Sequence, residues 1–308
     1  MKKTVTFVVP VYRNEGSIKP LHVSLVKEFQ DNFPELEYEI VFVDDGSDDN
    51  SLRDIMDVKF IDKNVKVIVL SRNFGQMGAI IAGWDKAKGN AVMNISADRQ
   101  EPVEQYTKMI KEWLAGAEIV IGIRENREDS GFTKFKSRIF YRLIKISIPE
   151  IPIGGFDVTL LDRKALNSLS TLQERGRFYQ GNILWLGFAK KYVPYTRLKR
   201  EIGKSQNNFF KMFAYTVNAY LNSSYLPLRM LSIIGFIVSF TGFAYALAII
   251  YAYAVHNTPF QGWAPIMMTL LIIGGIIMLM LGVLGEYIWR ILDEVKHRPY
   301  YIIKDSLD

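Results

Sequence analysis

The first 205 residues alternate short apolar runs with amphipathic stretches. Runs rich in Val and Ile occur at "TVTFVVPVY", "YEIVFVDDGS", "VKVIVLSRN", "NAVMNISAD" and "AEIVIGIRE". Stretches with helical spacing, such as "SIKPLHVSLVKEFQDNF" and "VEQYTKMIKEWLAG", separate them. Near-continuous apolar strands that alternate with helices are typical of a parallel sheet covered on both faces. We therefore predict an α/β fold with a mostly parallel sheet, whose ligands bind at the carboxyl ends of the strands.

Two runs without a charged residue follow, at 231–253 and 264–285. Each holds about 22 residues, and at about 1.5 Å per residue such a helix extends roughly 33 Å, enough to cross a hydrocarbon core of about 30 Å. Helices buried inside a soluble protein are the alternative, but such helices seldom run this far without a charge. We therefore predict a hairpin of two transmembrane helices.

Lys and Arg residues flank these runs, whereas the connecting segment 254–263 has neither. The positive-inside rule then predicts that both termini are cytoplasmic. Apolar residues from Phe209 to Tyr220 recur at helical spacing, which indicates a helix in the membrane interface, or alternatively a core-facing helix of the soluble part; Pro227 is expected to end it. The expected parts are a cytoplasmic catalytic domain over 1–205, a juxtamembrane amphipathic helix over 206–229, the hairpin over 230–290 and a cytoplasmic tail over 291–308.

Composition narrows the chemistry. The 308 residues include no cysteine, which excludes disulfides and thiolate zinc sites, and three scattered histidines, which disfavour a histidine-rich metal centre. The formal charge of +6 and the pI near 9.2 suit an anionic surface or a polyanion. Because many of the basic residues flank the apolar runs, we expect a membrane partner and no nucleic acid.

Polar residues follow every predicted strand. They occur in "PVYRNEG" (10–16), "DDGSDDNS" (44–51), "SRNFGQMGA" (71–79), "SADRQEP" (96–102) and "GIRENRED" (122–129). Asp-Gly-Ser after a strand is also a common turn and helix cap, so one such segment is weak support for a site. Five segments at corresponding strand ends are hard to explain by capping alone.

These motifs resemble glycosyltransferase family 2 with the GT-A fold, and within it the polyprenyl-phosphate glycosyltransferases. "VVPVYRNE", "VFVDDGSDD", "SRNFGQ", "ADRQEP" and the closing "GVLGEYIWRILDEVKHRPYYI" (282–302) carry the resemblance over nearly the whole chain. The branch holds dolichyl-phosphate mannose synthase and the bacterial undecaprenyl-phosphate glucosyl and formamido-arabinose transferases. The resemblance implies a GT-A domain followed by an interfacial helix and two transmembrane helices.

The resemblance also implies residue roles. Pro10, Tyr12 and Glu15 would shape the pocket for the base and ribose of the nucleotide sugar, and Asp45 would accept a hydrogen bond from the nucleobase. Further residues expected to bind the nucleotide sugar are Arg72, Lys204 and Ser205. Asp98 and Gln100 would hold Mg²⁺ or Mn²⁺ against the diphosphate. The catalytic set is Asp98, Asp157, Arg124, Arg138 and Arg200, with the arginines bringing two anions together. The alternative for Asp98 and Asp157 is that they are turn residues. The alternative for the basic residues is that they belong to a solvated or lipid-facing surface.

Four positions depart from the family pattern. Ser96 stands where most relatives begin the metal motif with Asp, Arg99 replaces the usual Leu, and Glu101 replaces an Asp. One carboxylate fewer should weaken the grip on the cation, for which Glu101 is a candidate replacement, and Ser96→Asp is expected to tighten cation binding by about tenfold, roughly 1.4 kcal/mol. Thr159 stands where many relatives carry Arg, which affects the acceptor side.

The expected function is that of an inverting, metal-dependent transferase in the bacterial inner membrane. It would move one sugar from a nucleotide sugar, UDP-linked in our interpretation, to undecaprenyl phosphate at the cytoplasmic leaflet, for glycans such as the O-antigen of lipopolysaccharide. We expect a multi-pass homo-oligomer. The alternatives are a membrane glycosyltransferase acting on a growing glycan or glycolipid, and a degenerate scaffold that binds nucleotide sugars without turnover. The sugar is not encoded in any one motif.

Overall fold

The computed structural model describes residues 2–124, 145, 148–152, 155–172, 179–198, 226–256 and 262–307. The chain divides into two compact units. One comprises Met1–Thr216 together with Pro299–Asp308, and the other comprises Val217–Arg298. We call the first the catalytic unit and the second the helical unit.

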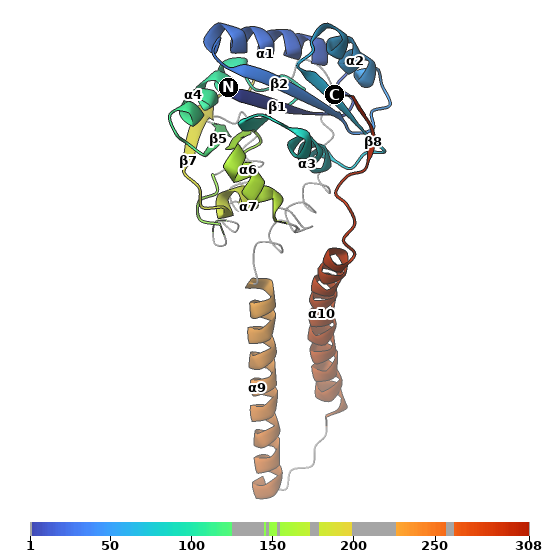
Figure 1. Cartoon of the computed structure of the whole chain (residues 1–308). Helices are drawn as coiled ribbons and strands as arrows, with labels where there is room; N and C mark the ends of the chain where they lie inside the picture. The colour runs from blue at the N-terminus through green and yellow to red at the C-terminus, as the bar shows by residue number, and fades with distance from the viewer. Residues whose placement is uncertain are drawn as a thin grey trace. The chain divides into compact units, whose positions relative to one another are not determined.

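A mixed sheet forms the centre of the catalytic unit (Figure 1). Its described strands are β1 (Thr4–Val11), β2 (Glu37–Asp44), β3 (Val65–Leu70), β4 (Ala91–Asn94), β5 (Ile119–Arg124), β6 (Thr159–Asp162), β7 (Lys190–Tyr195) and β8 (Ile303–Leu307). They lie in the order β7-β5-β6-β4-β1-β2-β3-β8. β4, β1, β2 and β3 are parallel neighbours, and β5 is parallel to β7, whereas β6 and β8 run antiparallel to the strands beside them. The predicted α/β fold with a mostly parallel sheet is confirmed.

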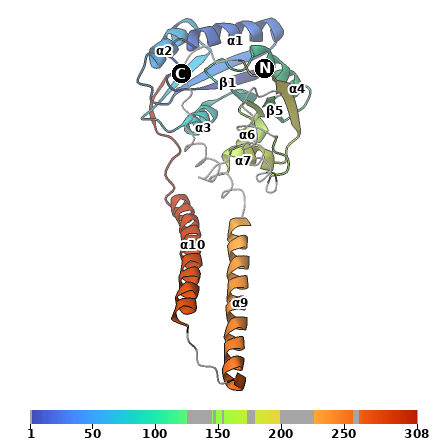
Figure 2. The same ribbon diagram turned by 180° about the vertical axis from the view of Figure 1, so that it is seen from behind.

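Helices cover both faces of this sheet, as its nearly continuous burial requires. The described helices of the catalytic unit are α1 (Ile18–Asn32), α2 (Ser51–Ile61), α3 (Gln76–Lys86), α4 (Val103–Leu114), α6 (Arg163–Ser170) and α7 (Tyr179–Trp185). Figures 1 and 2 show α1, α2 and α4 on one face and α3, α6 and α7 on the other. On the second face Gly83 of α3 lies so close to Val8 of β1 that a Cβ at residue 83 would overlap the valine side chain.

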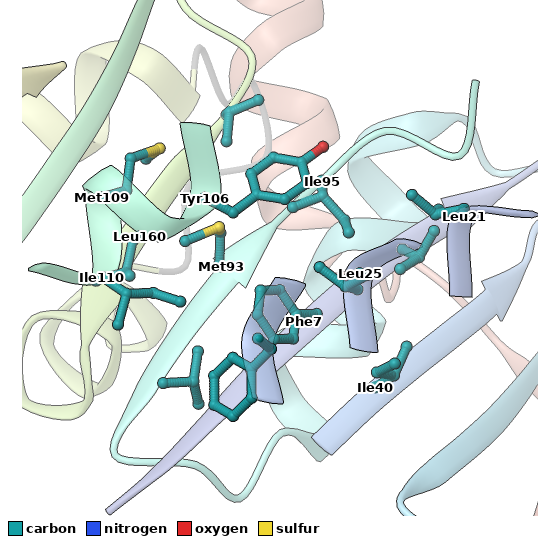
Figure 3. Packing of buried hydrophobic residues seen from close by; sticks show 14 of the residues in the cluster. Phe7, Leu21, Leu25, Ile40, Met93, Ile95, Tyr106, Met109, Ile110 and Leu160 are labelled. Atoms are coloured by element: carbon teal, nitrogen blue, oxygen red, sulfur yellow. The ribbon is translucent and has the colours of Figure 1, made fainter. Parts of the chain in front are cut away.

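The core lies between the sheet and the layer of α1 and α4 (Figure 3). Phe7 of β1 meets Phe29 of α1 edge-on, with ring centroids 5.8 Å apart. Met93 of β4 and Tyr106 of α4 are fully buried in the same cluster. This core fixes the strands whose carboxyl ends carry the polar motifs.

The end of the chain belongs to the catalytic sheet. Residues 303–307, which the sequence placed in a tail, form β8 on the outer side of β3. The backbone amide of Ser71 donates to the carbonyl of Ile302 (2.9 Å), and the hydroxyl of Tyr301 donates to Oδ2 of Asp85 on α3 (2.8 Å). Burial and the Asp85 carboxylate raise the pKa of Tyr301. The segment after the helical unit is thus tied to β3, to the loop that follows β3 and to α3.

The helical unit contains two long helices, α9 (Leu226–His256) and α10 (Trp263–Val295), of 31 and 33 residues. Among the described residues, one helix, α10, holds a stretch long and apolar enough to cross a membrane, Ile272–Val295, and α9 holds a shorter apolar stretch, Ile233–Tyr245. Pro227 lies in the first turn of α9, where its missing amide leaves no hydrogen bond unmade. The interfacial helix expected before this proline lies outside the described residues up to 225.

Candidate active site

The loops after β1 and β2 are joined at the carboxyl edge of the sheet. The amide of Asp45 donates to the carbonyl of Val11 (2.8 Å), and Nδ2 of Asn50 donates to Oε1 of Glu15 (2.8 Å). The guanidinium of Arg13 lies over the Tyr12 ring, 5.2 Å from its centroid. Pro10 is the penultimate residue of β1. These contacts place the three residues expected around the base and ribose on one edge of the sheet.

Asp45 holds the loop that follows β3. Its carboxylate accepts the backbone amides of Phe74 (2.6 Å) and Gly75 (2.9 Å), and the guanidinium of Arg72 stacks on the Phe74 ring at 4.5 Å. Asp45 is only 2% exposed, and this burial raises the pKa of its carboxyl group while the two amides oppose the rise. A carboxylate has about four lone-pair positions, so two amide bonds leave capacity for another donor. The expected contact with a nucleobase stays a prediction.

Asp98 and Gln100 share one turn after β4. The amide of Gln100 donates to Oδ1 of Asp98 (3.3 Å), and Arg99 between them has φ of 55°, in the left-handed region that a residue with a side chain seldom adopts. Such strained residues cluster at functional sites. The turn places Asp98 and Gln100 two residues apart after the end of a buried strand, with the backbone amide of Gln100 on the Asp98 carboxylate.

Two of the departures from the family pattern contact each other. The Ser96 hydroxyl donates to Oε1 of Glu101 (3.0 Å), and the Tyr106 hydroxyl lies 3.5 Å from Oε2. Glu101 is 3% exposed, and burial, with the nearby charge of Asp98, raises the pKa of its carboxyl group. Its carboxylate is therefore a buried partner of Ser96, which does not favour the idea that Glu101 replaces the missing cation ligand.

Arg124 and Asp157 form an ion pair beside this turn. Arg124 ends β5 and Asp157 lies just before β6, so the pairing of β5 with β6 brings the two together. The Tyr195 hydroxyl of β7 accepts from Nε of Arg124 (3.4 Å). Thr159, by contrast, is fully buried and bonded to the side chain of Asn94, so it stabilises the β4–β6 pair instead of facing an acceptor.

Arg197, two residues after β7, was missed by the sequence reasoning. Its Nη2 donates to Oε1 of Gln100, and the amide of Leu198 donates to the carbonyl of Gln100 (2.8 Å). Desolvation and the charge of Arg124 lower the pKa of Arg197. The only sequence signal for Arg197 is its place at the start of "RLKREIGKS", whose resemblance to the family motif concerns the later residues.

Comparison with known proteins identifies the fold and the enzyme class. The model of "Glycosyl transferase family 2" matches residues 6–170. The "Uncharacterized glycosyltransferase YkcC" of Bacillus subtilis is 38% identical over 303 residues, 98% of this chain and 93% of the relative. The "SfII prophage-derived bactoprenol glucosyl transferase" of Shigella flexneri is 37% identical over 304 residues, 98% of each chain. This chain belongs to glycosyltransferase family 2.

The fold of this glycosyltransferase is shared with solved enzymes at low identity. Glucosyl-3-phosphoglycerate synthase of Mycobacterium tuberculosis, solved with Mn²⁺, uridine-diphosphate-glucose and phosphoglyceric acid, has a TM-score of 0.51 and 16% identity over 72% of this chain and 79% of that chain. At this identity the likeness concerns the fold alone. It agrees with the parallel core of β1 to β4 described above.

The glycosyltransferase has oxygen donors that suit a divalent cation. Within the described ranges no three residues among His, Cys, Asp and Glu gather to form a complete protein cage. Mg²⁺ in transferases is nevertheless commonly held by one or two carboxylates, with substrate phosphates and water completing the shell. The Asp98 carboxylate and the Gln100 amide oxygen on one turn fit that description.

Other expected residues of the glycosyltransferase lie elsewhere. Arg138, Arg200, Lys204 and Ser205 lie outside the described residues, so their roles stay predictions. The catalytic unit also has a cavity of about 370 Å³ between α3, the end of α6 and residues 299–301. None of the predicted site residues lines it.

Proposed function

We propose that this glycosyltransferase moves one sugar from a UDP sugar to undecaprenyl phosphate at the cytoplasmic face of a bacterial inner membrane. The observation that carries the proposal is the cluster at the carboxyl edge of the sheet, in which Asp98 and Gln100 share a turn beside the Arg124–Asp157 pair. The near-full-length similarity to a bactoprenol glucosyl transferase of Shigella flexneri supports this acceptor class.

The residues divide the chemistry between two anions. Asp98 and Gln100 would hold Mg²⁺ or Mn²⁺, which, when bound, neutralises charge that develops on the departing nucleoside diphosphate. Arg124, oriented by Asp157, supplies a fixed positive charge for phosphate oxygens. A lipid phosphate is already ionised at neutral pH and attacks the anomeric carbon directly, with inversion, so no strong general base is needed. The absence of a histidine from the catalytic set is consistent with this reaction.

The sheet order supports a pair of membrane crossings. Because β8 lies in one sheet with β1 to β7, all eight strands must be on the same side of any membrane. The chain between β7 and β8 therefore crosses an even number of times. If α10 crosses, as its stretch Ile272–Val295 allows, a second crossing is required, and α9 is the other long helix between these strands in the described part. Both termini would then be cytoplasmic, as the basic flanks predict.

The exposed side chains of the helical unit also support a membrane location. Large apolar residues of α9 and α10 stand open at their surfaces, among them Phe236 (72%) and Met278 (70%). Large exposed apolar residues in this number suit contact with lipid or another protein. A lipid acceptor that never leaves the membrane gives the enzyme a reason to be held there.

The proposal is tested by a transfer assay with purified full-length protein. The enzyme is incubated with polyprenyl phosphate and a panel of UDP and GDP sugars, with Mg²⁺ or Mn²⁺, and the lipid product is identified by mass. We expect one UDP sugar to be transferred to the phosphate. Asp98→Asn should lower turnover at least about a hundredfold, ~2.7 kcal/mol, while the control Asp31→Asn, at an exposed site on α1, should not.

Three results would contradict the proposal or a part of it. Transfer to a glycan acceptor, with none to the lipid phosphate, would favour the growing-glycan alternative. Nucleotide-sugar binding without any product would favour the scaffold alternative. Near-normal turnover of Asp98→Asn in excess cation would remove the metal-ligand role of this acid.

A further inference from the structure

Arg197 engages the atom of Gln100 that a cation would use. The guanidinium group has only N–H donors, so the amide atom facing Nη2 must be the carbonyl oxygen, Oε1. The same oxygen is the hard donor available to Mg²⁺ or Mn²⁺ on this side chain. Oε1 of Gln100 can therefore bind either of two cations, the Arg197 guanidinium or a metal ion.

The surrounding contacts show that Arg197 also fixes the turn. The adjacent amide of Leu198 donates to the main-chain carbonyl of Gln100 (2.8 Å), so the 197–198 segment binds both the side chain and the backbone of this residue. The backbone amide of Gln100 in turn donates to Oδ1 of Asp98 (3.3 Å). The segment after β7 therefore holds the 98–100 turn in place.

The charges around Arg197 make this position sensitive to a cation. Asp98 and Glu101 attract its guanidinium, whereas the like charge of Arg124 repels it. A divalent cation at Asp98 and Gln100 would add a second and larger repulsion. A nucleoside diphosphate entering with the cation would offer Arg197 new anionic oxygens, for which a guanidinium fork is well suited.

We propose that Arg197 is a nucleotide-binding residue that donates to Gln100 Oε1 and transfers to the diphosphate when cation and nucleotide bind. The inference rests on the proposed use of a nucleotide sugar. Its consequence is that the cation alone binds weakly, because it must displace Arg197, whereas cation and nucleotide strengthen each other's binding. By linkage the strengthening is the same in both directions.

The test measures Mn²⁺ binding directly, with the full-length protein in detergent. Free Mn²⁺ is followed by electron paramagnetic resonance during titration, first without nucleotide and then with UDP. Arg197→Met keeps the length of the side chain and removes every donor, Arg197→Lys keeps the charge without the fork, and Arg53→Gln, at an exposed site on α2, is the matched control. Thermal unfolding of each variant confirms that it folds.

We expect wild type and Arg53→Gln to bind Mn²⁺ at least tenfold more tightly with UDP than without it. Arg197→Met should bind Mn²⁺ alone about tenfold more tightly than wild type and should lose most of the gain from UDP. Arg197→Lys should fall between them. Unchanged or weaker binding of Mn²⁺ alone to folded Arg197→Met would overturn the proposal, as would equally tight binding to wild type with and without UDP.

The titration without nucleotide separates this inference from the proposed function. It contains neither sugar nor lipid, so failure of the transfer assay would not alter its result. Conversely, a successful transfer assay with no change of Mn²⁺ affinity in Arg197→Met would reject the role of Arg197 and keep the proposed function.

Discussion

Restoring the family carboxylate at position 96 should destabilise this protein. The Ser96 hydroxyl lies 3.0 Å from Oε1 of Glu101, and Glu101 is 3% exposed. In Ser96→Asp a second carboxylate would therefore stand directly beside a buried one. The sequence alone favours tighter cation binding by this substitution, but the structure adds an opposing effect.

The opposing effect is the larger of the two. Two unit charges 4 Å apart repel by about 4 kcal/mol at an effective dielectric constant of about 20, compared with roughly 1.4 kcal/mol for a tenfold gain in cation affinity. Repulsion of this size favours the protonated form of one carboxyl group, so the pKa of the pair would be raised. The pKa of Glu101 is already raised by burial, and the new charge acts in the same direction.

The sign of the pH dependence follows from this raised pKa. A raised pKa means that the folded variant retains a proton at pH values above about 4.3, the usual carboxyl pKa, where the unfolded chain has released it. The loss of stability is therefore fully present above the raised folded pKa and disappears as the pH falls to about 4. At pH 7 we expect a loss of about 3 kcal/mol, which for a unit of this size lowers the midpoint of thermal unfolding by about 6–12 °C.

The measurement compares thermal unfolding of full-length Ser96→Asp with Ser96→Asn between pH 4.5 and 7.5. Asn has the size of Asp without its charge, and the double variant Ser96→Asp with Glu101→Gln removes the repelling partner. The Asp variant should melt well below the Asn variant at pH 7 and approach it at pH 4.5, and the double variant should recover. Midpoints of the two single variants within about 2 °C at pH 7 would refute the repulsion argument.

Three further outcomes follow from the packing and hydrogen bonds of the catalytic unit. Gly83→Ala should destabilise by about 1–3 kcal/mol, measured by chemical unfolding, because the new Cβ overlaps Val8. Asp45→Asn should lose one of the acceptors for the 74–75 amides and speed their hydrogen exchange, whereas unchanged protection would deny the role of Asp45 in this loop. Deletion of residues 303–307 should open the edge of β3 and increase aggregation in light-scattering measurements, with unchanged solubility counting against it.

The parts of the fold that the sequence predicted are those with a local signal. The strands β1 to β5 are short apolar runs, and their near-continuous hydrophobicity reports burial on both faces. β8 was not predicted, because its sequence "IKDSL" is largely polar. An edge strand tolerates such a sequence, since only one of its sides pairs with another strand. Its pairing with β3 also joins residues more than 200 positions apart, which no local pattern encodes.

The candidate site divides in the same way. Asp98 and Gln100 follow a recognisable motif, and strand topology brings Arg124 to Asp157. The contact of Arg197 with Gln100 spans 97 positions and depends on where β7 enters the sheet. Likewise, the Ser96 departure becomes intelligible only when its hydroxyl is seen to bind Glu101.

The position of β8 makes the order of synthesis part of the folding problem. The ribosome completes β7 roughly a hundred residues before β8, which at about 5–20 residues per second is a delay of about 5–20 s. Throughout that interval β3, with its run "VKVIVL", has an open edge of unpaired amides and carbonyls. The edge of β3 can pair with β8 only after both long helices have been synthesised. Completion of the sheet therefore depends on completion of the helical unit. A nascent chain whose synthesis stalls within α10 therefore exposes the unpaired edge of β3, which quality-control proteases and chaperones can recognise.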